Sequence, residues 1–256
     1  MTMRKRPSIR GFAAALISLT MTAACATAQT SPAQESAPEP VSSISTAPIA
    51  FGPDAPFATE IYNFFVQDEV FTPTACRTVF TGSSSIRFWF DLDDDFPGLN
   101  ALNRGFGGSE ITHVIGYFDF LLTKHQPREI IFYAGENDLN AGASPEDVAE
   151  RFSVFMDMKN ERIGDSPVYF LSIKPSFARV SELGAQTEAN ALIKAAAETR
   201  DDLIFVDIAA PMMDGDTPKR IFISDQLHMN LAGYEIWTET LGPLLSDPNR
   251  PKRSGC

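Results

Sequence analysis

Five short apolar runs, separated by segments with helical periodicity, constrain the fold of this 256-residue chain more than any other feature. The runs have the length of strands and occupy residues 78–81, 99–102, 129–134, 167–173 and 203–208. Nearly continuous hydrophobic strands that alternate with helices are typical of a parallel sheet covered on both faces. The alternation therefore predicts an α/β fold in which one five-stranded parallel sheet lies between two layers of helices.

Three of the remaining segments carry clear helical signals. Apolar residues at the spacing of one helical face run from Ile111 to Leu122. Ser144, Pro145 and Asp147 form a helix start, which predicts a helix as far as about residue 159. Asn230 can cap a last helix whose apolar face comprises Leu231, Tyr234, Trp237 and Leu241.

The first 28 residues predict export as a signal peptide. Four basic residues without an acid precede an apolar stretch, 11–24, that is too short to cross a bilayer comfortably. Ala26-Thr27-Ala28 fits cleavage before Gln29, whereas residues 22–25 resemble a lipoprotein box with Thr22 where an aliphatic residue is usual. We favour simple cleavage and a periplasmic or secreted protein; a lipid anchor at Cys25 is the alternative and the only membrane contact that we expect.

The mature chain is expected to consist of a linker and one domain. Residues 29–50 are rich in Ser, Pro, Ala, Thr and Glu and should form a flexible linker, which leaves residues 51–256 for the domain. Removing residues 1–28 takes away four of the 21 basic residues and none of the 33 acidic ones, so the net charge changes from −12 to −16. Because nucleic-acid binding needs clustered Lys and Arg, we expect no nucleic-acid partner.

Two cysteines remain after the leader, Cys76 and Cys256. In an exported protein they predict one disulfide that joins the C-terminus to the entrance of the first strand, with two free thiols as the alternative. The acidic run 91–95 lacks the glycine and glutamate positions of a calcium loop, so we expect no metal there.

Four separate segments place reactive residue types directly after predicted strands or before the last helix. They are Gly82-Ser83-Ser84-Ser85, residues 103–108, Gly135-Glu136-Asn137-Asp138 and Asp225-Gln226-Leu227-His228. The carboxyl ends of parallel strands meet at one edge of a sheet, which is where ligands bind in such folds. The four segments should therefore meet there.

Their chemistry is that of a serine nucleophile. A serine hydroxyl needs a base, and His228 can serve Ser84, with Asp225 close enough to orient the imidazole ring. Of the other histidines, His113 and His125 are expected at the surface. A developing oxyanion needs donors, and three are available: the N–H groups of Ser84 and Gly108 and the side-chain amide of Asn137.

These motifs resemble those of the SGNH/GDSL hydrolases over residues 78–245. Residues 80–89 are similar to the first block, in the subgroup where Gly-Asp-Ser becomes Gly-Ser-Ser, and residues 103–108, 135–138 and 224–230 are similar to the other three. The resemblance implies a flavodoxin-like three-layer α/β/α sandwich. It also implies Ser84 as the nucleophile, Asp225 and His228 as its partners, Gly108 and Asn137 as oxyanion donors, and no cofactor. Ser83 stands where the family usually has Asp, and three adjacent serines leave room for an error of register.

The expected function is hydrolysis of a carboxylic ester, with a small-molecule or carbohydrate ester as the partner. No long lid is recognisable, which favours short acyl groups such as acetyl on a carbohydrate. An inactive sugar- or envelope-binding protein and an O-acyltransferase that uses the same site are the alternatives. Candidates for the walls of an acyl or leaving-group pocket are aromatic or sulfur-containing, namely Phe88, Trp89, Phe106, Phe177 and Met229.

Overall fold

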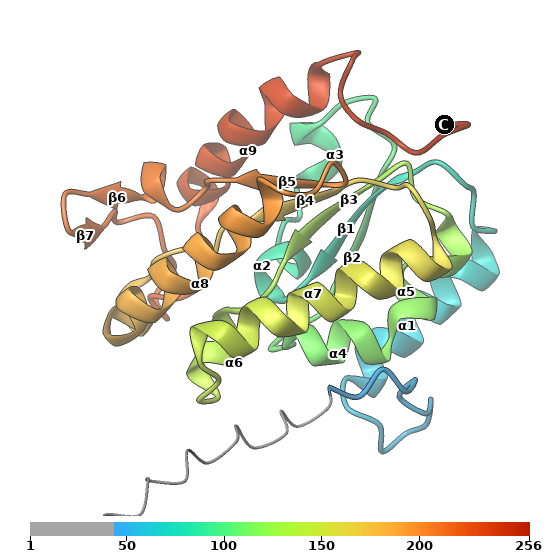
Figure 1. Ribbon diagram of the computed structural model, residues 1–256, viewed down its shortest axis with the longest axis horizontal. Helices are drawn as coiled ribbons and strands as arrows, with labels where there is room; N and C mark the ends of the chain where they lie inside the picture. The colour runs from blue at the N-terminus through green and yellow to red at the C-terminus, as the bar shows by residue number, and fades with distance from the viewer. Residues whose placement is uncertain (1–43) are drawn as a thin grey trace, which may run out of the picture. The chain divides into compact units, whose positions relative to one another are not determined.

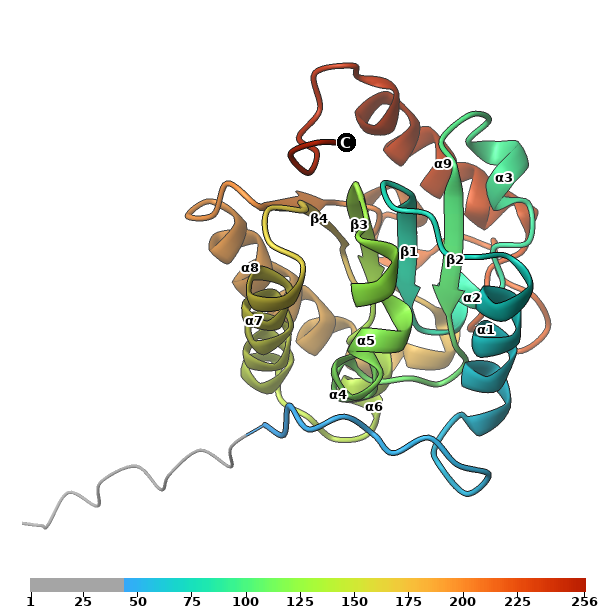
Figure 2. The same cartoon turned by 90° about the vertical axis from the view of Figure 1, so that its right-hand side faces the viewer.

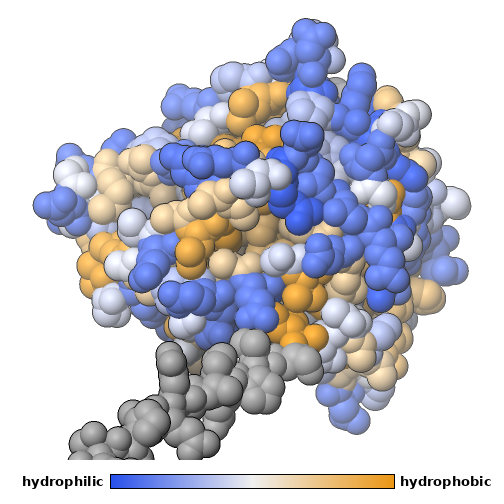
Figure 3. Space-filling view, in the orientation of Figure 1, coloured by the Kyte–Doolittle hydropathy of each residue, from blue (hydrophilic) through white to orange (hydrophobic). Residues whose placement is uncertain are grey.

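The computed structural model describes residues 44–256. The predicted signal peptide, residues 1–28, with its two cleavage alternatives, lies outside the described residues, and so does most of the predicted linker. Within 44–256, no helix is both long and apolar enough to span a bilayer. On the face seen in Figure 3, hydrophilic residues predominate and hydrophobic residues form small groups between them.

A five-stranded parallel sheet forms the centre of the domain (Figures 1 and 2). Its strands are β1 (Thr78–Gly82), β2 (Ala101–Gly105), β3 (Glu129–Tyr133), β4 (Val168–Leu171) and β5 (Leu203–Val206). The order β2-β1-β3-β4-β5 is that of flavodoxin-like folds, and helices cover both faces, so the predicted three-layer α/β/α sandwich is confirmed. The strand order reverses between β1 and β3, which is where such sheets bind ligands.

Alternate strand residues contribute to two separate cores. Val79, Ile130 and Phe170 point to one face and Phe80, Ile131 and Leu171 to the other. Against the first face pack α1 (Ala58–Val70), α4 (Ile111–Gly116), α5 (Phe118–Leu121), α6 (Glu136–Asn140), α7 (Pro145–Arg162) and α8 (Leu183–Ala197). Against the second pack α2 (Ser84–Arg87), α3 (Leu92–Asp95) and α9 (Leu231–Ser246). Short 3₁₀ turns, η1 (Thr123–His125), η2 (Phe177–Glu182) and η3 (Ala210–Met212), and the antiparallel pair β6 (Met213–Asp214) and β7 (Thr217–Pro218) complete the described elements.

The predicted helix starts at Ser144 and Asn230 are confirmed. The Ser144 hydroxyl accepts a hydrogen bond from Asp147 N, and the Asp147 carboxylate accepts one from Ser144 N, which is a capping box. The Asn230 side chain accepts from Gly233 N. The predicted apolar face of α9 was wrong at Leu231, the first residue of the helix, which is 69% exposed, whereas Trp237 and Leu241 are fully buried.

Two further expectations differ from the structure. The helix predicted from 111 to 122 is interrupted at Tyr117, where the backbone leaves the helical region, and continues as α5 and η1. The linker predicted to end at residue 50 is too long, because Ile44 and Ile49 pack against the first core and Ile49 N donates to Gly116 O at 2.8 Å. The ordered body therefore begins before residue 51.

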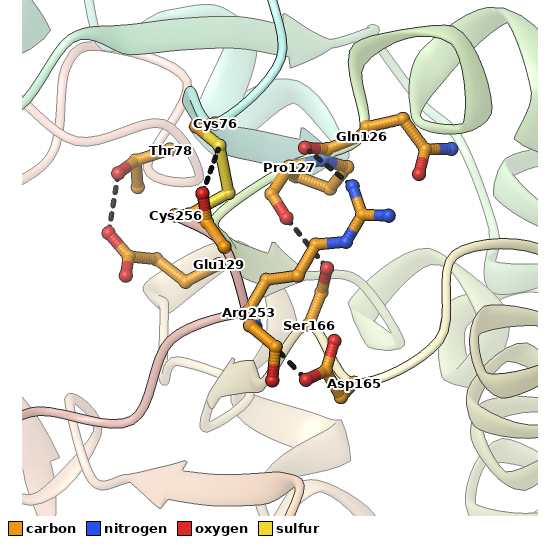
Figure 4. The surroundings of a disulfide bond; sticks show 11 residues. Cys76, Thr78, Gln126, Pro127, Glu129, Asp165, Ser166, Arg253 and Cys256 are labelled. Atoms are coloured by element: carbon orange, nitrogen blue, oxygen red, sulfur yellow. Dashed lines mark hydrogen bonds between the residues drawn. A yellow bond between two sulfur atoms is a disulfide. The ribbon is translucent and has the colours of Figure 1, made fainter.

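The amino ends of the strands are closed by the C-terminal tail. Cys76 and Cys256 form the predicted disulfide, with Cα atoms 5.4 Å apart. Figure 4 shows the tail beside it, where Arg253 donates to Gln126 O and Ser254 N donates to Asp165. The disulfide thus links the C-terminal residue to the segment just before β1, at the edge of the sheet opposite the reactive segments.

Candidate active site

A glycine at the end of β1 allows the chain to turn into α2. Gly82 has φ +128°, and a Cβ there would lie 1.9 Å from the carbonyl oxygen of Tyr133. The same oxygen accepts a hydrogen bond from Ser83 N at 2.9 Å. Only glycine permits this close approach of β1 and β3, and the approach sets Ser84 as the first residue of α2 at the carboxyl edge of the sheet.

Ser84 is the serine that reaches the histidine. Its Oγ lies 2.9 Å from His228 Nε2, whereas Ser83 and Ser85 are both 2% exposed and point into the protein. The geometry therefore selects Ser84 among the three adjacent serines.

His228 is held by Asp225 within one tight loop. Asp225 Oδ2 lies 2.6 Å from His228 Nδ1, and Asp225 Oδ1 accepts hydrogen bonds from the backbone N–H groups of Leu227 and His228 at 2.9 Å each. A carboxylate beside Nδ1 favours the tautomer with the proton on Nδ1, which leaves Nε2 to accept from the Ser84 hydroxyl. The structure thus brings Ser84, His228 and Asp225 together, although the first is 144 residues from the histidine.

Asp225 is ionised at neutral pH. Burial raises the pKa of its carboxyl, but the hydrogen bonds from the His228 ring and from the N–H groups of Leu227 and His228 outweigh burial and bring the pKa to about 2. A negative charge is therefore available to stabilise a protonated imidazole ring.

The expected oxyanion donors lie on the three segments that follow β1, β2 and β3. Among residues 44–256, neither Ser84 N nor Gly108 N has an acceptor. Gly108 has φ +76°, and no atom lies within 4 Å of where its Cβ would be, so the backbone is open on that side. The Asn137 side chain donates one hydrogen bond to Ser109 O at 3.0 Å, and its amide retains a second hydrogen.

Ser109 and Asp138, which the sequence analysis did not single out, fix these loops. The Ser109 hydroxyl lies 3.1 Å from Gly82 O, which ties the Gly108 loop to the end of β1. Both carboxylate oxygens of Asp138 accept from Ile111 N, at 3.1 and 3.2 Å, and Oδ1 also accepts from Arg151 at 2.8 Å. Burial raises the pKa of Asp138, while the Arg151 guanidinium opposes that shift.

A cavity of about 570 Å³ adjoins His228. Three of the predicted wall residues, Phe88, Trp89 and Met229, line it, and the Phe88 ring meets the His228 ring edge-on at 4.8 Å. The two other expectations were wrong: Phe106 is fully buried in the first core, and Phe177 packs edge-on against Phe222 outside this cavity. Sequence reasoning missed the other lining residues, which are the exposed apolar Phe90, Ile223 and Leu231, the carboxylates Asp91, Asp95 and Glu235, and Asn230 and Tyr234.

Neither of the other histidines is a plain surface residue. His113 is half-buried, because its Nδ1 accepts from Glu110 N at 3.0 Å and its ring packs edge-on against Phe57. The prediction for His125 was wrong, since this side chain is 1% exposed. The turn η1 folds it inward toward Asp68 and Arg104, away from the reactive serine.

Residues 81–236 match the GDSL-like lipase/acylhydrolase family. Comparison with curated protein sequences finds no match. Solved structures with the same fold include a GDSL-like lipase from Bacteroides thetaiotaomicron, with 16% identity, a TM-score of 0.63 and coverage of 74% of this chain and 98% of the other. The lipase/acylhydrolase from Enterococcus faecalis has 18% identity, a TM-score of 0.54 and coverage of 70% and 100%. A catalytic mutant of the acetylxylan esterase Axe2 from Geobacillus stearothermophilus has 12% identity, a TM-score of 0.53 and coverage of 68% and 95%.

Proposed function

Because the chain belongs to the GDSL-like lipase/acylhydrolase family, which indicates hydrolase activity, we propose that it is an exported serine esterase that cleaves carboxylic esters through an acyl-enzyme. The observation that supports this most is the pair of contacts at His228, 2.9 Å to Ser84 Oγ and 2.6 Å to Asp225 Oδ2. This arrangement is the one that activates a serine hydroxyl at neutral pH.

In the proposed mechanism, Ser84 Oγ attacks the ester carbonyl carbon while His228 Nε2 takes the hydroxyl proton. The ionised Asp225 stabilises the imidazolium ring. The oxyanion of the tetrahedral intermediate accepts hydrogen bonds from Ser84 N, Gly108 N and the free amide hydrogen of Asn137. His228 then gives its proton to the departing alkoxide. Water attacks the acyl-enzyme with His228 again as the base, which releases the acid and restores Ser84.

The decisive variant is Ser84→Ala. Removal of the nucleophile should lower kcat for p-nitrophenyl acetate by on the order of 10⁴-fold or more and abolish covalent labelling by a serine-directed phosphonate. The matched control is Ser83→Ala, whose hydroxyl makes no capping hydrogen bond in α2 and should be dispensable. A Ser84→Ala protein that retains normal turnover would overturn the assignment.

For the substrate we propose a short acyl group, such as an acetyl ester on a carbohydrate. Two of the proteins with this fold are named for such chemistry, the acetylxylan esterase and a carbohydrate esterase family 3 protein from Talaromyces cellulolyticus. A second candidate, an ester with a larger apolar group, is favoured by the cavity beside His228, because its size of about 570 Å³ falls in the range that holds drug-sized ligands, about 300–1,000 Å³.

A series of acyl lengths decides between these substrates. Initial rates on p-nitrophenyl acetate, butyrate and octanoate, together with acetate release from acetylated xylan, give kcat/KM for each. A maximum at acetate with release from xylan supports the first candidate, whereas a rise toward octanoate supports the second. Transfer of the acyl group to added alcohols in preference to water would instead indicate an acyltransferase. A wild-type protein that turns over no ester and resists the phosphonate would favour a binding protein.

We also propose that the protein acts outside the cytoplasm. The charge pattern of residues 1–28 supports export, and so does the Cys76–Cys256 disulfide, because such bonds persist in oxidising compartments. The intact mass of the mature protein distinguishes cleavage before Gln29 from lipid attachment at Cys25.

A further inference from the structure

A buried ion pair lies beneath the reactive residues. Lys174, which follows β4, is fully buried, and Glu136, the first residue of α6, is 4% exposed. Lys174 Nζ donates to both carboxylate oxygens of Glu136, at 3.0 and 3.1 Å, and to the carbonyl oxygen of Leu227 at 2.9 Å. All three ammonium hydrogens therefore have acceptors, and one acceptor belongs to the loop that carries His228.

Tyr133 extends this pair toward the serine. Its hydroxyl donates to Glu136 Oε2 at 2.7 Å, and its carbonyl oxygen accepts a hydrogen bond from Ser83 N at 2.9 Å. Burial and the Glu136 charge raise the pKa of Tyr133 well above its usual range, so the phenol stays neutral and acts as a donor.

Each end of this network is the chain neighbour of a residue of the proposed catalytic site. Ser83, whose N–H donates to Tyr133 O, precedes Ser84. Glu136 precedes Asn137, and Leu227 precedes His228. The nucleophile, the amide donor and the base come from loops that are distant in sequence, and the network joins all three loops through residues of β3, α6 and the segment after β4.

A contribution to the stability of the fold does not by itself explain why the chain buries this ion pair. Removing two charges from water costs several kcal/mol for each ion, and replacing a buried ion pair by apolar residues is often neutral or stabilising. In return, a buried pair with fixed hydrogen-bond geometry favours a single arrangement of the groups around it, since any displacement leaves a charge or a carbonyl group without a partner.

We propose that Lys174 and Glu136 are positioning residues that hold the His228 loop and the Asn137 segment in register with Ser84. This register matters only if Ser84 is the nucleophile, so the proposal rests on the esterase function proposed above. Neither residue contacts the reacting atoms, so both act through the loops that they hold.

The test compares Lys174→Met with the double variant Lys174→Met/Glu136→Gln. The single variant leaves Glu136 buried without a counter-ion and Leu227 O without a donor, so it should lose thermal stability and lower kcat about 10–100-fold with KM changed by less than about threefold. The double variant removes the uncompensated charge and should regain much of the stability. Its kcat should stay low, because Leu227 O still lacks its donor.

A second buried lysine provides a matched control. Lys159 of α7 is also fully buried, and its Nζ donates to Asp202 at 2.8 Å and to Gly164 O at 3.0 Å. Lys159→Met should lower thermal stability in the same way and leave kcat within about twofold of the wild type. A purely structural role for Lys174 predicts instead that activity returns with stability in the double variant, and that result would overturn the proposal.

Hydrogen exchange gives a readout that does not depend on turnover. The amides of Leu227 and His228 donate to Asp225 Oδ1, so loosening of this loop should raise their exchange rates about tenfold or more in both Lys174 variants and leave them unchanged in Lys159→Met. Unchanged rates in the Lys174 variants would refute the positioning role. An inactive wild type with protected amides at 227 and 228 would refute the esterase function and leave the positioning role standing.

Discussion

The two ends of the central sheet use their polar groups in opposite ways. At the amino end, the fully buried Glu129 accepts from Thr78 at 2.5 Å and from Arg250 at 3.1 Å, and a disulfide closes the same edge. At the carboxyl end, the N–H groups of Ser84 and Gly108 have no acceptor among the residues that the structure describes. The Glu129 carboxylate at one end is paired within the protein, whereas two backbone donors at the other end have no acceptor within the described residues.

Residues that stabilise the fold and residues expected to act in catalysis therefore lie at opposite ends of the same strand, β1, which is five residues long. The paired groups at the amino end stabilise the folded state and take no part in the proposed reaction, so changes there should alter the free energy of unfolding and leave kcat unchanged. Donors left unpaired at the carboxyl end do not stabilise the fold, because a hydrogen bond that is not made contributes nothing. Changes there should alter kcat and little else.

In the comparison of the two ends, the largest effect is expected for Asn137→Ala at the carboxyl end. Loss of one oxyanion donor should lower kcat roughly 10²–10³-fold, with KM nearly unchanged, because the donor meets charge that develops only in the transition state. Steady-state kinetics on p-nitrophenyl acetate measure this. The control is Asn140→Ala at the exposed end of the same helix, α6, which should keep normal kinetics. Equal kcat values for the two variants would mean that Asn137 is not a donor.

An effect of similar size in free energy is expected at the amino end for Cys76→Ser/Cys256→Ser. The disulfide joins residues 180 apart, and a loop of that length predicts a loss of about 2–5 kcal/mol in the free energy of unfolding. Urea titration measures the loss, and kcat should stay within about twofold of the wild type. A large fall in kcat without a change in stability would contradict the separation of the two ends.

The fold could be predicted from the sequence because its strands are buried on both faces. Each of the five strands begins within two residues of the start of its predicted apolar run. The end of β2 was missed, because this strand extends to Gly105 through Asn103 and Arg104, which hydrophobicity does not mark as strand residues. Arg104 is 1% exposed because it pairs with Asp68 of α1. A charged residue buried by a distant partner has no signature in its own segment.

The residues of the candidate site could be predicted where they belong to a recognisable motif, and could not be predicted where their role depends on contacts in the folded chain. Ser84, Gly108 and Asn137 belong to short motifs that follow strands, so topology brings them to one edge of the sheet, and Asp225 and His228 belong to a motif just before the last helix. Lys174 lies outside those motifs, and its significance comes from partners at positions 136 and 227 that only the folded chain brings together. A lysine that directly continues the apolar run 167–173 was the one available signal.

The smallest effect is expected for His125, the other residue whose burial the sequence did not reveal. Burial, Arg104, Lys124 and Arg77 lower its pKa, Asp68 opposes them, and the result is about 4, against about 6.5 for an unperturbed histidine. The unfolded chain therefore binds a proton that the folded chain rejects, so stability is complete above pH 6.5 and is lost as the pH falls toward 4. Over that interval the free energy of unfolding should fall about 1–3 kcal/mol further in the wild type than in His125→Gln.

Urea titrations of both proteins at several pH values measure that difference, and subtraction removes the contribution of the carboxylates that the two proteins share. The control is Leu122→Val, a fully buried neighbour without a titratable group, which should lower stability by a similar amount at every pH. Parallel pH profiles for the wild type and His125→Gln would show that His125 gains a proton as easily in the folded protein as in the unfolded chain. Because this cluster joins α1 to β2 and η1, away from the Ser84 hydroxyl, kcat measured at pH 7 should not follow the loss of stability.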